Sequence, residues 1–186
     1  DNTFVSVGAG LNYQPTTTSG VNGAGAAVDV AFGKWITPSI GTRLGYHGIN
    51  MTGSTTWSSG HLDILWNPWN TFAKEKKFRT YEGVPYLHGG LARSNDFSGR
   101  EFGAGWNNVL RLGGGVSANL DLRASIFAGH QIHNFAGRSI MLTAMAGLTY
   151  DIHTNTWRDE IVRYREDDEN GNVARNWAIS TNVLDY

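Results

Sequence analysis

The sequence contains no cysteine, only 4 prolines and no long hydrophobic run, and these absences exclude several classes of protein. Without cysteine the chain has no disulfide, no thiolate metal site and no cysteine nucleophile. No run of about 18 apolar residues is present, which excludes a transmembrane helix. The formal net charge of −1 argues against a nucleic-acid-binding protein that uses a broad basic surface.

Glycine and aromatic residues, by contrast, are abundant, with 24 Gly, 7 Trp, 7 Tyr and 8 Phe. This composition, without the period of a buried helix, favours many strands over a helical bundle. A length of 186 residues corresponds to one domain, or to one domain with an appendage. The first residues, DNTFVSV, lack the basic and apolar regions of a signal peptide, so we expect a chain that is cytosolic or already processed.

Residues 116–126, VSANLDLRASI, alternate strictly between apolar and non-apolar side chains, which is the period of a β-strand. The same period recurs in seven other segments, less regularly in 80–92 and 102–112. A bulge at Gly89 and Gly90 would account for the irregularity of 80–92. The eight predicted strands span residues 3–13, 24–32, 39–47, 61–67, 80–92, 102–112, 116–126 and 139–150.

The predicted connections alternate in length. Long polar connections around PTTTSGVNG, TGSTTWSSG, RSNDFSGRE and GHQIHNFAGR alternate with the short GKWITP and LGGG, and only PWNTFAKEKKF breaks the rule. Long loops on one side and short turns on the other are typical of outer-membrane barrels, whose long loops lie outside the cell.

The apolar face of each strand belongs either in the core of a soluble sandwich or against the lipid around a membrane barrel. Many glycines on the polar face favour the barrel, because a narrow lumen needs small side chains and a solvated face does not. Aromatic residues near strand ends suggest two interfacial girdles: Phe32, Trp35, Trp66, Trp69 and Tyr150 at the short-turn end, and Tyr13, Tyr46 and Trp106 toward the long-loop end. We therefore predict an all-β fold, an eight-stranded antiparallel transmembrane up-and-down β-barrel.

The stretches FGKWITPSIGTRLGY, HLDILWNPWNTF, VPYLHGGLARS, FGAGWNNVLRL and AGLTYDI resemble the eight-stranded outer-membrane barrels of the outer membrane protein A type, in the version found in Bacteroidota. The resemblance covers most of residues 1–150. It implies a barrel family more than an activity. Members of the family commonly continue into a periplasmic peptidoglycan-binding domain, and residues 151–186 contain no segment that matches the motif of that domain.

The predicted inward positions carry four acids and three bases, which form a candidate lumen charge network: Asp29, Arg43, Asp63, Glu82, Arg111, Asp121 and Arg123. Strand order suggests contacts of Asp29 with Arg43, of Asp63 with Glu82 and Arg111, and of Asp121 with Arg123. Because an unpaired buried charge is costly, we expect a salt-bridged plug that closes the barrel. The alternative is a gated ion path or a proton site, for which eight strands leave little room.

An enzymatic alternative is a lipid A deacylase or acyltransferase, which uses serine, histidine and a carboxylate near the membrane rim. Its candidate residues are Ser125, His130, His133 and Ser139, but no acid lies near the two histidines in the sequence. His130 and His133 have a weak metal-ligand spacing without a third ligand, and His88 carries no distinguishing signal. We therefore predict no enzyme, no metal site and no cofactor.

Residues 151–186 are acidic, include the run REDDENGN and contain no lipid-facing stretch. We predict a barrel domain over 1–150 and, over 151–186, a polar periplasmic linker or a docking tail for another envelope protein. The final WAISTNVLDY regains apolar alternation and is suited to adding a strand to the sheet of a partner.

The expected location is the bacterial outer membrane. Its lipid and lipopolysaccharide are the expected partners, together with other envelope proteins bound through the tail. Peptidoglycan joins these if the natural chain continues, and nucleic acid is excluded. The predicted role is structural, in membrane integrity, anchoring or a larger outer-membrane complex. The alternatives are a narrow diffusion channel and a lipid A-modifying enzyme.

Overall fold

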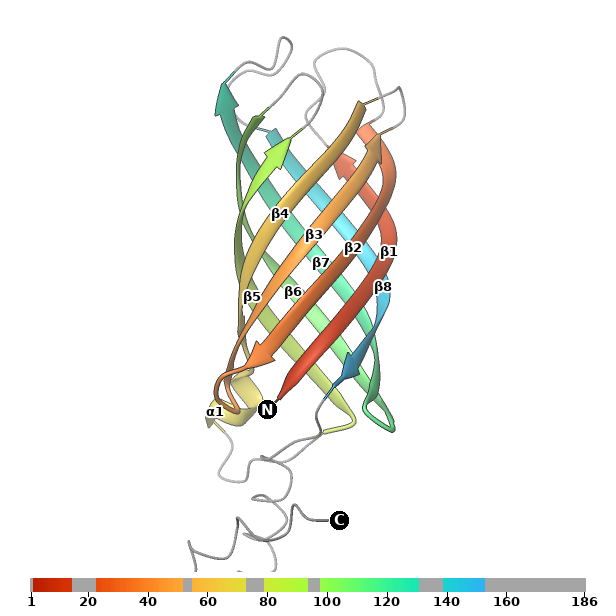
Figure 1. The fold of residues 1–186 in the computed structure, drawn as a ribbon, viewed down its shortest axis with the longest axis vertical. Coiled ribbons are helices and arrows are strands. Elements are labelled where there is room, and N and C mark those ends of the chain that lie inside the picture. The colour runs from red at the N-terminus through yellow and green to blue at the C-terminus, as the bar shows by residue number, and fades with distance from the viewer. Residues whose placement is uncertain are drawn as a thin grey trace, which may run out of the picture.

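The chain folds into a closed barrel of eight antiparallel strands, seen in a computed structural model (Figure 1). The structure describes residues 2–14, 23–51, 55–72, 79–93, 98–130 and 139–152. The strands are β1 (Thr3–Gln14), β2 (Gly23–Trp35), β3 (Ile40–Met51), β4 (Thr55–Trp66), β5 (Tyr81–Arg93), β6 (Ser98–Gly113), β7 (Val116–His130) and β8 (Ser139–Asp151). A short helix, α1 (Pro68–Phe72), follows β4.

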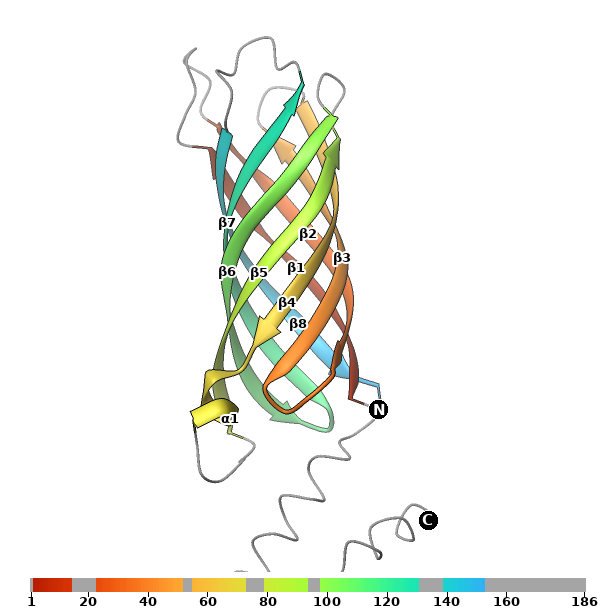
Figure 2. The ribbon, with the colours of Figure 1, turned by 90° about the vertical axis from the view of Figure 1, so that its left-hand side faces the viewer.

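Each strand pairs with its neighbours in the sequence, and β1 closes the barrel by pairing with β8. An even number of strands brings the start of β1 and the end of β8 to the same end, beside α1 (Figures 1 and 2). The predicted fold class is therefore confirmed. Within the described part of the chain, no α-helix has the length and hydropathy needed to cross a membrane.

Several strands are longer than predicted at the end away from the termini, which we call the outer end. There β4 begins at Thr55 within TGSTTWSSG, so only three residues separate it from β3. His130, predicted in a loop, is the last residue of β7. The expected long loops are thus partly strand, because polar residues continue the ladder beyond the apolar part of each strand.

The predicted bulge at Gly89 and Gly90 is wrong. Both glycines keep continuous register with β6, opposite Phe102 and Glu101. The register shift between β6 and β7 lies instead between Arg111 and Gly113, next to a turn. Gly113, Gly114 and Gly115 all have positive φ there, which a residue with a side chain rarely adopts. The turn LGGG therefore depends on glycine.

The two faces of the sheet have the reverse of the polarity found in a water-soluble protein. Large apolar side chains cover the outside, with exposed fractions such as 65% for Leu87 and 58% for Val30. The inside is rich in buried polar groups, and Asp63 is 0% exposed. Because exposed apolar surface on this scale needs an apolar solvent, the outer face contacts lipid and the lumen is the core.

Apolar side chains also fill the lumen near both ends. At the end that holds the termini, which we call the inner end, Phe4, Leu65, Val84 and Tyr86 form a cluster, with Trp35 and Val109 packed against it. Nearer the outer end, Ala27, Ala92, Phe127 and Met141 are buried. Charged and polar side chains occupy the lumen between them.

Candidate functional site

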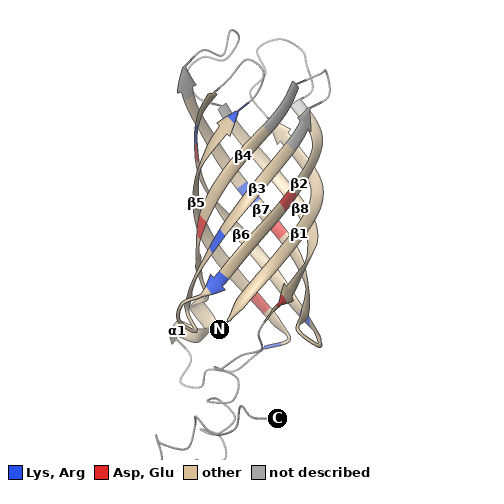
Figure 3. Ribbon diagram, in the orientation of Figure 1, with Lys and Arg blue, Asp and Glu red and all other residues tan. Residues whose placement is uncertain are grey.

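The middle of the lumen holds a cyclic set of charged and hydrogen-bonding side chains, which we call the central network. Its members come from β2, β3, β4, β5 and β7: Asp29, Arg43, His61, Asp63, Tyr86, Asp121 and Arg123. All seven are buried. Figure 3 shows how residues of both charges are distributed along the strands between the two ends of the barrel.

His61 lies between two carboxylates. Its Nε2 is 2.9 Å from Oδ2 of Asp29, and its Nδ1 is 2.8 Å from Oδ1 of Asp63. A carboxylate can only accept a hydrogen bond, so both ring nitrogens must carry hydrogen for both contacts to form. His61 therefore acts as a cation in this arrangement. A second histidine, His47, places its Nδ1 3.2 Å from the same Asp29 oxygen.

Arg43 joins the two sides of the barrel. Its Nε donates to Oδ2 of Asp63 at 2.6 Å, and its Nη2 donates to Oδ2 of Asp121 at 3.1 Å. Asp63 lies on the neighbouring strand β4, whereas Asp121 lies on β7, across the lumen. Strong tilt of the strands brings these distant segments to the same level, as barrel closure requires.

Tyr86 and Arg123 complete the cycle. The Tyr86 hydroxyl donates to Asp121 and accepts a hydrogen bond of 3.0 Å from Nε of Arg123. Nη2 of Arg123 lies 3.4 Å from Oδ2 of Asp29. The guanidinium of Arg43 also lies 4.8 Å from the centre of the Tyr86 ring, within cation–π range.

The central network balances its own charge. Three carboxylates face two guanidiniums and the imidazolium of His61, so the cycle is neutral as a unit. Removing one member would leave an uncompensated charge in a region of low dielectric constant, which is strongly unfavourable. This arrangement suits a rigid core better than a site for a charged ligand.

Glycines on the inner face make room for the large members of the central network. A Cβ atom at Gly45 would lie 2.6 Å from Nε2 of His61. A Cβ at Gly105 would overlap the ring of Tyr86. The many small residues on the polar face thus have the physical role that a narrow lumen predicts.

The structure places all seven charges of the predicted lumen network on the inner face, but it pairs most of them differently from the prediction. Asp29 contacts His47, His61 and Arg123, and the expected partner Arg43 binds Asp63 and Asp121 instead. Asp121 and Arg123 both contact the Tyr86 hydroxyl.

Glu82 and Arg111 form the predicted ion pair at 2.7 Å, away from the central network and toward the inner end. Asp63 does not join them, since it binds His61 and Arg43. Arg111 is also 3.9 Å from Asp151. This pair is partly open to solvent, because the Arg111 side chain is 27% exposed.

A second cluster joins Ser125, His88 and Glu101. The Ser125 hydroxyl donates to Oε1 of Glu101 at 2.7 Å and lies 3.1 Å from Nε2 of His88. The residue types match a hydrolase triad, but all three are buried inside the barrel, away from the lipid face.

The other enzymatic candidates that the structure describes, Ser139 and His130, lie at strand ends. Ser139 begins β8 and pairs with Phe127, and His130 ends β7 opposite Ser98. His133 lies outside the described residues, so the weak metal-ligand spacing of His130 and His133 lies partly outside them too. Among the residues described, no group of three or more His, Asp or Glu could hold a metal ion.

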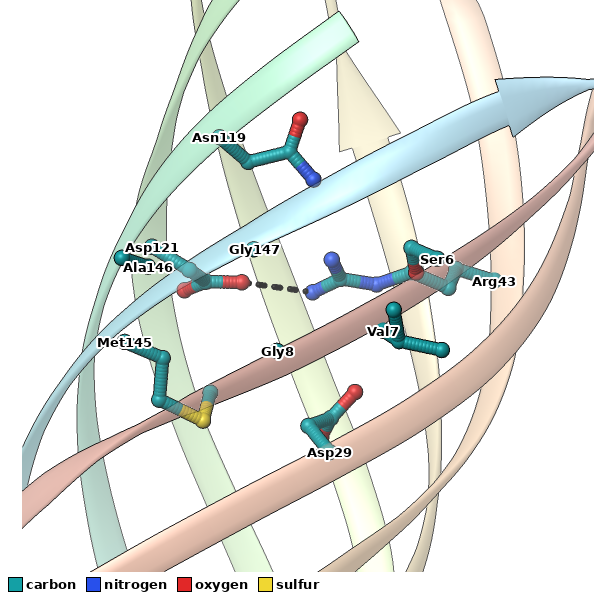
Figure 4. A pocket seen from close by; sticks show the side chains of 10 residues that line it. All are labelled: Ser6, Val7, Gly8, Asp29, Arg43, Asn119, Asp121, Met145, Ala146 and Gly147. Atoms are coloured by element: carbon teal, nitrogen blue, oxygen red, sulfur yellow. Dashed lines mark hydrogen bonds and ion pairs between the residues drawn. The ribbon is translucent and has the colours of Figure 1, made fainter. Parts of the chain in front are cut away.

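Two small cavities in the described part of the lumen are both lined by Arg43. One has a volume of about 20 Å³ and lies beside the Arg43–Asp121 ion pair, with Asn119 and Asp29 on either side (Figure 4). The other, of about 40 Å³, lies toward the inner end and is lined by Glu82 and Arg111. Such volumes hold one to a few water molecules and no larger solute.

The aromatic residues predicted for the two interfacial girdles lie on both faces of the barrel wall. Trp66, Trp69 and Tyr150 are exposed on the outside near the inner end, as predicted, and Tyr13 is exposed near the outer end. Tyr46 is exposed near the middle of β3.

Two predicted positions in the girdles are wrong. Trp35 packs against the apolar cluster of the lumen rather than facing lipid. Trp106 lies in mid-strand and its Nε1 donates to Oδ1 of Asn108, which also accepts from the hydroxyl of Tyr81. The Trp106 side chain therefore extends toward the aromatic residues of the inner end, because its indole N–H binds the outward-facing Asn108 of β6.

Comparison with the solved structure of a natural protein shows the same fold. The crystal structure of Neisserial surface protein A matches with a TM-score of 0.68 and 10% identity, over 82% of this chain and 98% of that chain. De novo designed transmembrane β-barrels match with a TM-score of 0.45 and 12% identity, over 81% of this chain and 96% of that chain. The fold and the lipid-facing surface together define a transmembrane β-barrel. No protein-family model matches the chain, and no curated protein sequence matches it.

Proposed function

We propose that the protein is a structural barrel of the bacterial outer membrane, with a role in envelope integrity or in anchoring other envelope components. The observation that carries this proposal is the filled lumen. Ion-paired side chains occupy its middle, and buried apolar residues lie toward each end. A barrel built in this way spans the membrane without providing a path for solutes.

The orientation follows from the general habit of bacterial barrels, whose termini and short turns lie in the periplasm. Both ends of the described barrel, Thr3 and Asp151, lie at the inner end. The inner end then faces the periplasm and the outer end faces the exterior. Residues 151–186 would enter the periplasm, where a docking or linker role connects the barrel to other envelope proteins or to peptidoglycan.

Reconstitution of the purified full chain into planar lipid bilayers tests this function. We expect insertion without steady ion conductance. Insertion has to be shown independently, by resistance of the barrel to protease in vesicles. Steady conductance of the inserted, unmodified protein would contradict the structural role.

A narrow channel is the second candidate, and one observation favours it. Both cavities are lined by Arg43, so this single side chain borders both spaces. Movement of Arg43 would join the two spaces. Conductance of the unmodified protein that rises in an Arg43→Ala variant would favour a channel, whereas silence of both proteins would favour the structural role.

A lipid A-modifying activity has less support. The Ser125–His88–Glu101 cluster lies inside the barrel, and lipid lies outside it. Mass spectrometry of lipid A from cells with and without the protein tests this alternative. We expect identical lipid A species. The proposed link to the outer membrane protein A type rests on the sequence stretches of residues 1–150 alone.

A further inference from the structure

Charges of opposite sign lie on opposite faces of the barrel wall. Every carboxylate of the described strand residues faces the lumen: Asp29, Asp63, Glu82, Glu101, Asp121 and Asp151. The charged residues that face outward from these strands are all cations. Lys34 lies at the inner end of β2, and Arg93 and Arg100 lie at the outer end of β5 and β6.

Arg93 and Arg100 are neighbours on the outer surface. Arg93 lies opposite Ser98, and Arg100 lies opposite Leu91, so the two arginines are diagonal neighbours on adjacent strands. Diagonal positions of an antiparallel pair are roughly 7–8 Å apart, within reach of long side chains. Both residues are exposed. Their guanidiniums can therefore converge on one group that lies between them.

The two arginines stand where the apolar surface of β5 and β6 ends. On the side of the barrel centre they are followed by Leu91 and Phe102, which are 72% and 55% exposed. Leu87, whose side chain is 65% exposed, continues this apolar strip along β5. On the other side of Arg93, β5 ends. A ligand at this place would meet cations at its head and apolar side chains along its tail.

Nothing in the described part of the chain neutralises this pair of cations. Among the residues described there, neither Arg93 nor Arg100 forms an ion pair, although every other arginine placed in a strand has a carboxylate partner. Like charges on the same face of neighbouring strands repel each other. An anion bound between them would turn this repulsion into attraction.

We propose that Arg93 and Arg100 bind a phosphate group of lipid A, with its acyl chains lying along Leu91, Phe102 and Leu87. This inference rests on the proposed location and orientation, because lipid A forms the outer leaflet of the outer membrane. Arginine suits a phosphate because its planar guanidinium donates two hydrogen bonds to the oxygens. The acyl chains account for the apolar strip, which a free phosphate would not need.

Native mass spectrometry of the full chain in detergent, titrated with purified diphosphoryl lipid A, tests the site. We expect lipid A adducts on the unmodified protein and at least a tenfold loss of affinity in the double variant Arg93→Gln/Arg100→Gln. Lys34→Gln, which removes an outward cation at the opposite end, is the matched control and should bind normally. Heat-modifiable migration on a gel shows that each variant is folded.

Two further probes separate phosphate recognition from general lipid binding. Dephosphorylated lipid A should bind the unmodified protein as weakly as lipid A binds the double variant, and phosphatidylglycerol should bind more weakly than lipid A. Equal binding of lipid A to the unmodified protein and to the double variant would overturn the site. The site would also be overturned if dephosphorylated lipid A or phosphatidylglycerol bound the unmodified protein as tightly as lipid A does. Failure of the protein to insert into bilayers would instead defeat the proposed function.

Discussion

The lumen and the outer surface of the barrel are built from the same strands, but they follow opposite rules. Inside, carboxylates, guanidiniums and histidines lie almost fully buried and contact one another at 2.6–3.4 Å. Outside, many leucine, valine and aromatic side chains of the strands are 37–72% exposed, and the few charges lie near strand ends. The difference shows that the position of a residue in the two-residue period sets its environment, and that burial in this protein favours polar groups.

The largest expected effect is in the central network. Arg43→Met should lower the free energy of unfolding by about 3–5 kcal/mol, because two buried carboxylates lose their partner. Urea unfolding in lipid vesicles measures it. Lys34→Met, which removes an exposed cation, should change the same quantity by no more than about 0.5 kcal/mol. Equal losses in the two variants would erase the distinction between lumen and surface.

A charge placed on the outer surface should lower the free energy of unfolding nearly as much as the loss of Arg43. Leu122 is exposed in the middle of β7, so Leu122→Arg should destabilise the barrel by about 2–4 kcal/mol in lipid. Leu112 is exposed near the inner end of β6, and Leu112→Arg should cost about 1 kcal/mol or less there. The free energy of unfolding of both variants is measured in the same vesicles. Equal losses in the two variants would contradict the proposed depth of Leu122.

Two tyrosine hydroxyls, one in the lumen and one on the outer surface, allow the two environments to be compared by removing a single atom. Tyr86→Phe removes the hydroxyl that joins Asp121 and Arg123, and we expect a loss of about 1–3 kcal/mol because buried polar partners stay unpaired. Tyr81→Phe removes a hydrogen bond to Asn108 on the outer surface, where about 1 kcal/mol or less is expected. Urea unfolding should therefore rank the two variants in this order.

The smallest effect is expected from the tail. A chain that ends after Ile152 keeps every strand of the described barrel, so this barrel should fold with unchanged heat-modifiable migration on a gel. The full chain, run beside it, is the control. A shortened chain that fails to fold would show that residues beyond 152 belong to the barrel.

The strands and their two faces were largely predictable from the sequence, whereas the partners inside the lumen were not. In residues 116–126 strict alternation identified β7 and both of its faces, because the period of a strand is local information. The ion pair of Arg43 with Asp121 joins β3 to β7, and it depends on the tilt and stagger of the closed barrel.

The sequence contained a signal for the contact of His61 with Asp63 that the sequence analysis did not use. His61 and Asp63 are two residues apart on one strand and so share the inner face, which predicts a contact between them. The role of His88 had no such signal, because Ser125 and Glu101 come from other strands. The ends of strands were also predicted wrongly, since polar residues from Thr55 to Ser59 continue the ladder at the outer end.

The assignment of the two faces is tested most directly by a nitroxide scan of residues 116–126 in lipid vesicles, one introduced cysteine at a time. The chain has no cysteine of its own, so each label reports a single position. Collision with oxygen, which concentrates in lipid, should peak at every even-numbered position from Val116 to Ile126 and fall at every odd-numbered one. Loss of this two-residue period, or access of a water-soluble nickel chelate to the even-numbered positions, would contradict a lipid-facing apolar surface.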